Sequence, residues 1–162
     1  MSGVVNQSIF KYMVGLMVLS GPVLLGQAKP GIYITMNLEL DLCHHKIKLI
    51  NSENLYCLSE EPILDLNAFE RVEEIIYDSI YELRKFRIVL TQKGADYLNT
   101  IGTKLPDHSI ALVVNNMLVS VIDLNGATDT RSIIIWDYAD NQAMEWVHQT
   151  LIDRITANHK KS

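Results

Sequence analysis

The stretch RIVLTQKGADYL, residues 87–98, limits the fold of this chain more than any other part of the sequence. It begins with apolar, β-branched residues typical of a strand and continues into residues typical of a helix start. Thr91 is an N-cap residue type, since its hydroxyl can accept a hydrogen bond from the backbone of the first helical turn. Gly94 and Ala95 then place small residues in that turn. We therefore expect a helix over about 92–103 that begins close against a sheet.

The same stretch raises the question of a ligand at the helix N-terminus. Phosphate-binding loops require several glycines or a nest of backbone amides, with a lysine at the end. Residues 91–95 contain one glycine, and Lys93 falls on the exposed side of the helix. The residues favour a structural joint between a strand and a helix, and they predict no cofactor.

The first 28 residues have the layout of a secretory signal peptide. A polar start with one lysine precedes an apolar run over 12–26, and Gly26-Gln27-Ala28 supplies the small residues that a signal peptidase recognises. The run is shorter than the roughly 20 residues that span a bilayer, and Pro22 interrupts it. We expect a mature chain that begins near Lys29, has no membrane span and is exported to the periplasm or the cell exterior. The alternative is an uncleaved N-terminal anchor.

Length and charge exclude several classes of partner. A chain of 162 residues is typical of a single domain. Its formal net charge is -5, and its lysines and arginines are scattered. Because no basic stripe is present to neutralise a row of phosphates, we expect no binding to nucleic acid. The same acidic balance argues against attachment to anionic lipid.

The chain contains two cysteines, Cys43 and Cys57. An oxidising compartment permits a disulfide between them, and closing a loop of about 15 residues removes roughly 3 kcal/mol of unfolded-state entropy. Two buried free thiols are the alternative, which the spacing leaves open. A zinc site formed by Cys43, His44, His45 and Cys57 is a further alternative. It is disfavoured because successive strand residues point to opposite faces and because zinc sites usually contain two closely spaced ligand pairs.

No catalytic constellation is evident in the sequence. It has no Gly-x-Ser-x-Gly motif, and its other histidines fall in a loop, on a helix and near the C-terminus. The acidic pairs 60–61 and 73–74 are sequence neighbours, which do not converge on one site. We therefore predict neither catalytic nor metal-binding residues.

Apolar periodicity and turn residues indicate an α+β fold, an antiparallel sheet with two main helices packed on one face. Asn115 and Asn116 suit a tight hairpin turn, because asparagine tolerates a positive φ. Residues 29–59 form N-terminal strands that belong to one compact unit with 60–158. The expected strands are 31–42, 46–50, 55–58, 110–114, 117–124 and 131–137, and the last helix is 139–157.

Residues 65–87 have two interpretations. Their apolar positions recur every three or four residues, which favours one amphipathic helix capped by Asp65. The alternative is a short helix at 66–71 followed by a hairpin with arms 73–80 and 83–91. The abundance of isoleucine and tyrosine favours this alternative, because both residues are common in strands.

Three motifs in order resemble a known family. EPIL (61–64), RIVLTQKGADYL (87–98) and IALVVNNMLVS (110–120) are similar to the head subdomain of the first periplasmic domain of SecD and SecDF, accessory subunits of protein export. The resemblance covers about 60–157. It implies the hairpin, rather than the long helix, between residues 66 and 87.

The resemblance also implies a function. In that family the head is implicated in contacting emerging polypeptide, so we expect an exported, non-enzymatic module that binds protein or unfolded polypeptide, linked to protein export or the cell envelope. Proton-driven activity belongs to a membrane body and is not carried over. Val121 and Ile122 stand where the family tends to Ala-Pro, and Asn115-Asn116 where it has Asp-Gly. The alternative is a small exported metal-binding protein or enzyme that uses Cys43, His44, His45 and Cys57.

Overall fold

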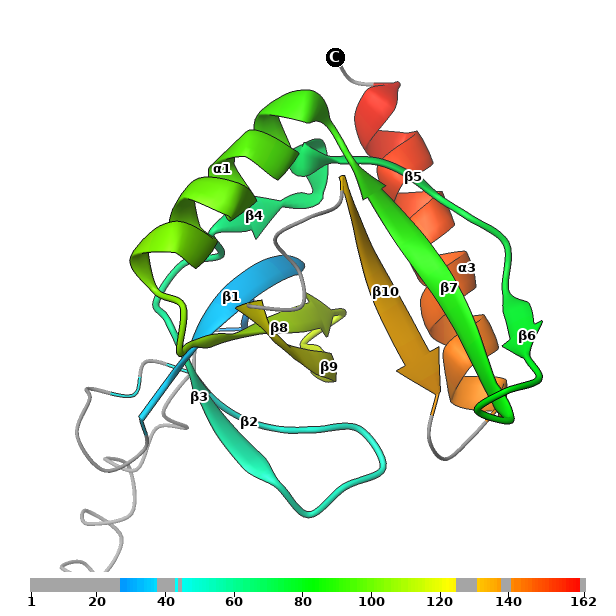
Figure 1. Cartoon of the computed structure of the whole chain (residues 1–162), viewed down its shortest axis with the longest axis horizontal. Coiled ribbons are helices and arrows are strands. Elements are labelled where there is room, and N and C mark those ends of the chain that lie inside the picture. The colour runs from blue at the N-terminus through cyan, green and yellow to red at the C-terminus, as the bar shows by residue number, and fades with distance from the viewer. Residues whose placement is uncertain (1–26, 38–42, 44, 125–130, 138–140, 161–162) are drawn as a thin grey trace, which may run out of the picture.

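The structure is a computed structural model that describes residues 27–37, 43, 45–124, 131–137 and 141–160 (Figure 1). The described part has an α+β fold, as the sequence predicts, with antiparallel strands and two long helices. In chain order its elements are β1 (Gly31–Met36), β2 (His45–Lys48), β3 (Leu55–Leu58), β4 (Leu64–Asp65), the 3-10 turn η1 (Leu66–Ala68), β5 (Phe69–Val72), β6 (Ile76–Asp78), β7 (Leu83–Leu90), α1 (Gln92–Lys104), β8 (Ser109–Val114), β9 (Met117–Asp123), β10 (Ser132–Asp137) and α3 (Asn141–His159).

The strands form two sheets. The first has the order β2-β3-β1-β8-β9, with β4 also paired to β1. It curls until the end of the β2 strand meets β9, where the amide of Ile50 donates to the carbonyl of Leu118 over 2.9 Å. Side chains of Tyr33, Leu58 and Val113 fill the inside of the curl. The β8 strand is buried on both faces, which accounts for its unbroken apolar sequence.

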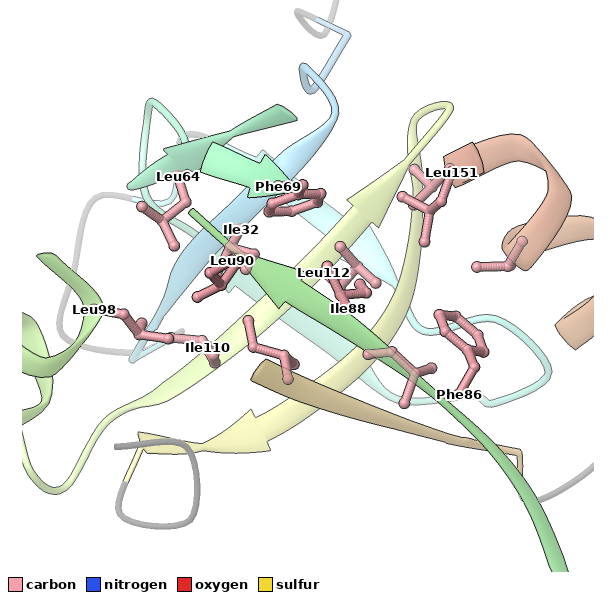
Figure 2. Packing of buried hydrophobic residues seen from close by; sticks show 14 of the residues in the cluster. Ile32, Leu64, Phe69, Phe86, Ile88, Leu90, Leu98, Ile110, Leu112 and Leu151 are labelled. Atoms are coloured by element: carbon pink, nitrogen blue, oxygen red, sulfur yellow. The ribbon is translucent and has the colours of Figure 1, made fainter. Parts of the chain in front are cut away.

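The second sheet has the order β10-β7-β5, and β6 also pairs with β7. In Figure 1 this sheet lies in front of α3. Its inward residues on β7, namely Phe86, Ile88 and Leu90, pack with residues of β1, β8 and both helices to form the main core, as Figure 2 shows. The apolar stripe of α3 joins this core through residues spaced by three or four: Met144, Val147, Leu151 and Ile155.

Between residues 65 and 87 the chain forms η1, β5 and the β6–β7 hairpin. The single long helix that periodicity favours is wrong, and the hairpin implied by the resemblance is confirmed. The expected short helix covers only 66–68, since Phe69 already pairs with Leu90 in the sheet. The apolar stripe does not correspond to one buried face, because Phe69 is fully buried whereas Ile76 and Ile80 are exposed.

Other elements lie close to their expected positions. The helix predicted over 92–103 is α1, and that predicted over 139–157 is α3, described from residue 141. The first predicted strand, 31–42, is described as far as residue 37 and is extended over 31–36; residues 38–42 lie outside the described residues, as do residues 1–26 of the expected signal peptide.

Asn115 and Asn116 form the two-residue turn between β8 and β9, with φ values of 48° and 62°. Each side chain also holds another part of the chain. The Asn115 amide oxygen accepts from Arg154 of α3, and that of Asn116 accepts from the backbone amide of Ala28 over 3.0 Å. Because Ala28 is buried inside the curl, the folded unit includes this residue, one position before the expected mature start near Lys29.

The junction between β7 and α1 contacts η1. Thr91 is the N-cap of α1, and its Oγ1 accepts from the amide of Gly94 over 3.1 Å. The backbone amide of Thr91 donates to the carbonyl of Ala68 over 2.9 Å. A Cβ on Gly94 would lie 2.9 Å from that same carbonyl oxygen. The glycine is therefore needed where the helix start meets η1, and Ala95 beside it is buried in the core.

We expect Gly94→Ala to destabilise the fold by about 1–3 kcal/mol. The added methyl group would overlap the carbonyl oxygen of Ala68, which the hydrogen bond from Thr91 holds in place. Chemical unfolding measures this change. Asn99→Ala, at an exposed position of the same helix, is the matched control and should shift the unfolding free energy by less than about 0.5 kcal/mol. Equal stability of Gly94→Ala and the unsubstituted chain would contradict the close contact.

Candidate functional site

The cysteines and histidines of the alternative metal site have other partners. Cys43 and Cys57 are joined in a disulfide, with their Cα atoms 5.3 Å apart. The imidazole of His45 lies edge-on to the ring of Tyr33, and its Nε2 is 2.9 Å from the carbonyl oxygen of Glu60. His44 lies outside the described residues. Among the residues that the structure does describe, no three His, Cys, Asp or Glu side chains are placed to hold a metal ion.

The remaining polar candidates do not gather at one place. His148 lies on α3, edge-on to Phe86, with its Nε2 at 2.8 Å from the carbonyl oxygen of Glu73. His108 lies before β8 and His159 ends α3. Within the described ranges no polar or charged residue is buried. These three histidines therefore do not form a common site.

Several hollows occur on the described surface, among them a cleft and a groove. A cleft of about 170 Å³ lies between the curled sheet and the start of α3, lined mainly by apolar residues such as Leu49, Ile135 and Met144. A groove of about 840 Å³ runs along the start of α1. The Lys29–Glu61 ion pair lies on this groove, and Thr91 contributes to its lining while its hydroxyl serves as the helix cap. The cleft has room for one apolar side chain, and the groove is open and lined by both apolar and charged residues.

The strongest surface feature is the apolar tip, defined as Ile76, Tyr77, Ile80 and Tyr81 of the β6–β7 hairpin. Seven large hydrophobic side chains are exposed in the described part of the chain, and these four lie within six consecutive positions. Their exposed fractions run from 52% for Ile76 to 83% for Ile80. Figure 1 shows this hairpin at the end of β7 remote from α1. Such a concentration of exposed apolar surface is typical of a binding site.

The turn that carries the apolar tip is held in one conformation. One carboxylate oxygen of Asp78 accepts from the amides of Ile80 and Tyr81, at 3.0 and 3.3 Å, and the other pairs with Lys85. Glu82 completes the turn with a φ of 53°.

Ring contacts fix one side of the tip to the sheet. The Tyr81 ring packs edge-on to Trp136, with centroids 6.0 Å apart, and the Lys85 ammonium lies 4.6 Å from the centroid of the same indole. The tip therefore presents its apolar groups in a prearranged form.

The apolar tip also has an open backbone edge. The β6 strand pairs with β7 on one side, and no other described strand pairs with it. Successive residues of β7 direct their backbone amide and carbonyl groups alternately toward the strands on its two sides. The amide of Leu90 donates to the carbonyl of Arg131 on the β10 side, so every second residue from Leu90 back to Arg84 also faces β10. Arg84 therefore makes no backbone hydrogen bond with Tyr77, the residue opposite it on β6. The amide and carbonyl of Tyr77 face away from β7, where an extended peptide can pair with them.

Sequence reasoning did not identify this site. The sequence predicts the hairpin arms but not the exposure of their apolar side chains, because the apolar face of a strand is normally buried. One signal was present: isoleucine and tyrosine occur together twice, at 76–77 and 80–81, around a turn where polar residues are usual. The residues singled out from the sequence, Thr91, Gly94, Ala95, Asn115 and Asn116, all have structural partners elsewhere.

Asp78 links the order of the tip to pH. Its hydrogen bond with Lys85 lowers the pKa of the carboxyl below the ordinary value, and the amides of Ile80 and Tyr81 act in the same direction against the effect of burial. Because the folded pKa is depressed, the stabilisation is complete above the unfolded pKa of about 3.9 and is lost as pH falls through the folded pKa.

We expect the side-chain carboxyl signal of Asp78 in NMR to titrate below about pH 3.9, with the amide signals of Ile80 and Tyr81 shifting at the same midpoint. Lys85→Met removes the main cause and should raise that midpoint. A midpoint at or above the ordinary value in the unsubstituted chain would contradict the role assigned to Asp78.

No helix in the described ranges is long and apolar enough to cross a bilayer. No family model matches the sequence, and no curated protein matches it. Two solved structures are similar to the chain. "Structure and function of a membrane component SecDF that enhances protein export" matches with a TM-score of 0.54 and 10% identity, over 93% of this chain and 70% of that chain.

The other, "Crystal structure of SecDF in Super-membrane-facing form", matches with a TM-score of 0.53 and 15% identity, over 80% of this chain and 19% of that one. At these identities the similarity concerns the fold, and at that level the resemblance to the SecDF head is confirmed. The chain spans about a fifth of the length of this second structure.

Proposed function

We propose, from the SecDF fold of this chain and its exposed apolar tip, that the protein is a non-enzymatic module that binds segments of other polypeptides. The observation that carries the proposal is the cluster formed by Ile76, Tyr77, Ile80 and Tyr81 on one ordered hairpin. One of the structurally similar proteins is a membrane component that enhances protein export. A polypeptide in transit exposes apolar side chains and unpaired backbone. The exposed side chains of the tip can pack against the former, and the open edge at Tyr77 can pair with the latter.

The expected binding is weak and reversible. A large apolar side chain contributes ~1.5–3 kcal/mol when it passes from full exposure to full burial. Association costs several kcal/mol in lost freedom, so four partly exposed side chains support dissociation constants on the order of micromolar. Backbone pairing with Tyr77 adds affinity with little dependence on sequence, as in other cases of strand addition.

We further propose that the protein acts outside the cytoplasm, in the periplasm or at the cell exterior. The signal-peptide pattern of residues 1–28 and the Cys43–Cys57 disulfide both support this location. The disulfide also occupies the two thiols on which the metal-binding alternative depends.

The test uses the full chain and a fluorescently labelled, reduced and alkylated polypeptide that cannot fold. We expect fluorescence anisotropy to detect binding, and Ile80→Ser/Tyr81→Ser to weaken it at least about tenfold, because the most exposed apolar groups of the tip are removed.

Tyr97→Ser is the matched control, since Tyr97 is an exposed aromatic residue on α1, away from the tip. This variant should bind like the unsubstituted chain. If the double variant and Tyr97→Ser retain equal affinity, the apolar tip is not the binding site.

A further inference from the structure

The charges around the apolar tip define the kind of segment that fits it. We propose, resting on the polypeptide-binding function above, that the tip takes an extended segment whose short apolar stretch is flanked by lysine or arginine.

The basic residues of the second sheet already have acidic partners. Each of them lies in an ion pair, and the pairs are Arg71 with Glu70 and Glu73, Arg84 with Glu145, Lys85 with Asp78, Arg87 with Glu73, and Arg131 with Glu70. These five basic residues share four carboxylates, so every cation of this sheet has an acidic partner within reach.

Two acidic residues beside the tip have no such partner. Glu74 lies two positions before Ile76, and Glu82 directly follows Tyr81; both are exposed, and neither takes part in an ion pair within the described structure. Residues 73–85 contain four acidic and two basic side chains, so this stretch carries two net negative charges. The apolar tip is thus bracketed by uncompensated carboxylates.

This charge pattern selects among occupants. A second copy docking tip to tip would bring the Glu74 and Glu82 carboxylates of both copies together, which is unfavourable. An anionic membrane surface is repelled by the same carboxylates. A segment with basic residues on either side of its apolar stretch brings opposite charges together while it buries the tip.

The backbone geometry sets the spacing of such a segment. Tyr77 offers the amide and carbonyl of the open edge, and Glu74 lies three residues before it, no more than about 10 Å away along the chain. Glu82 lies across the turn, beyond the tip. A segment paired at Tyr77 therefore places two or three apolar residues over the tip and reaches the carboxylates with residues about three positions to either side.

The experiment compares three peptides with the full chain in its disulfide-bonded form. Each peptide has the same central Leu-Ile-Leu, and its flanks carry lysine, serine or glutamate three positions from the centre. We expect the lysine peptide to bind about fivefold more tightly than the serine peptide, from two exposed charge pairs, and the glutamate peptide to bind most weakly. The difference should shrink at 0.5 M salt, where such pairs are screened.

Glu74→Gln/Glu82→Gln should abolish the preference for lysine while retaining affinity for the serine peptide. Glu60→Gln/Asp107→Asn is the matched control: it removes the same charge from exposed positions away from the hairpin and should keep the preference.

The possible failures are distinct. Equal affinity for all three peptides, weakened by Ile80→Ser/Tyr81→Ser, would overturn the charge inference and leave the polypeptide-binding function standing. Absence of binding to any peptide and to the unfolded polypeptide would overturn both. Dimerisation in analytical ultracentrifugation that Ile80→Ser abolishes, or stronger binding to phosphatidylglycerol vesicles than to the lysine peptide, would assign the tip to another occupant and contradict the inference.

Discussion

Backbone pairing along β7 is the constraint on which the other features depend. This strand pairs with β10 on one side and with β5 and β6 on the other, and its inward residues Phe86, Ile88 and Leu90 lie in the main core. One of its ends continues through the Thr91 cap into α1, and the other carries the apolar tip. Because eight residues of the strand are held by neighbours, both ends are fixed relative to the core. A hairpin that projects from such a strand can expose apolar groups without losing its shape.

The parts of the fold that the sequence predicted are those specified by local chemistry. The transition from strand to helix at 87–104 follows from N-capping by Thr91. The turn at Asn115-Asn116 follows from the tolerance of asparagine for a positive φ. The stretch 65–87 was ambiguous because its helix-like period arises from unrelated causes. Phe69 is buried by tertiary pairing with β7, whereas Ile76 and Ile80 face solvent. Periodicity reports where apolar residues lie and carries no information on whether anything covers them.

The candidate site could not be predicted from the sequence for the same reason. Its residues are apolar, and an apolar residue in a predicted strand is expected to be buried. The charges are also apparent only in three dimensions: Arg84 pairs with Glu145, sixty-one positions away, and Glu82 has no ion-pair partner among the described residues. By contrast, the disulfide lies at the end of the curled sheet and stabilises a part of the molecule that the proposed site does not use.

The most direct measurement places a photo-crosslinking amino acid at position 80, 55 or 97, three exposed apolar positions in different parts of the fold. Each variant is illuminated with a labelled unfolded polypeptide, and the adducts are quantified. If the β6–β7 hairpin is the binding surface, the adduct forms at position 80 and is near background at 55 and 97. Equal yields at all three positions, or a higher yield at 55 or 97, would contradict the account.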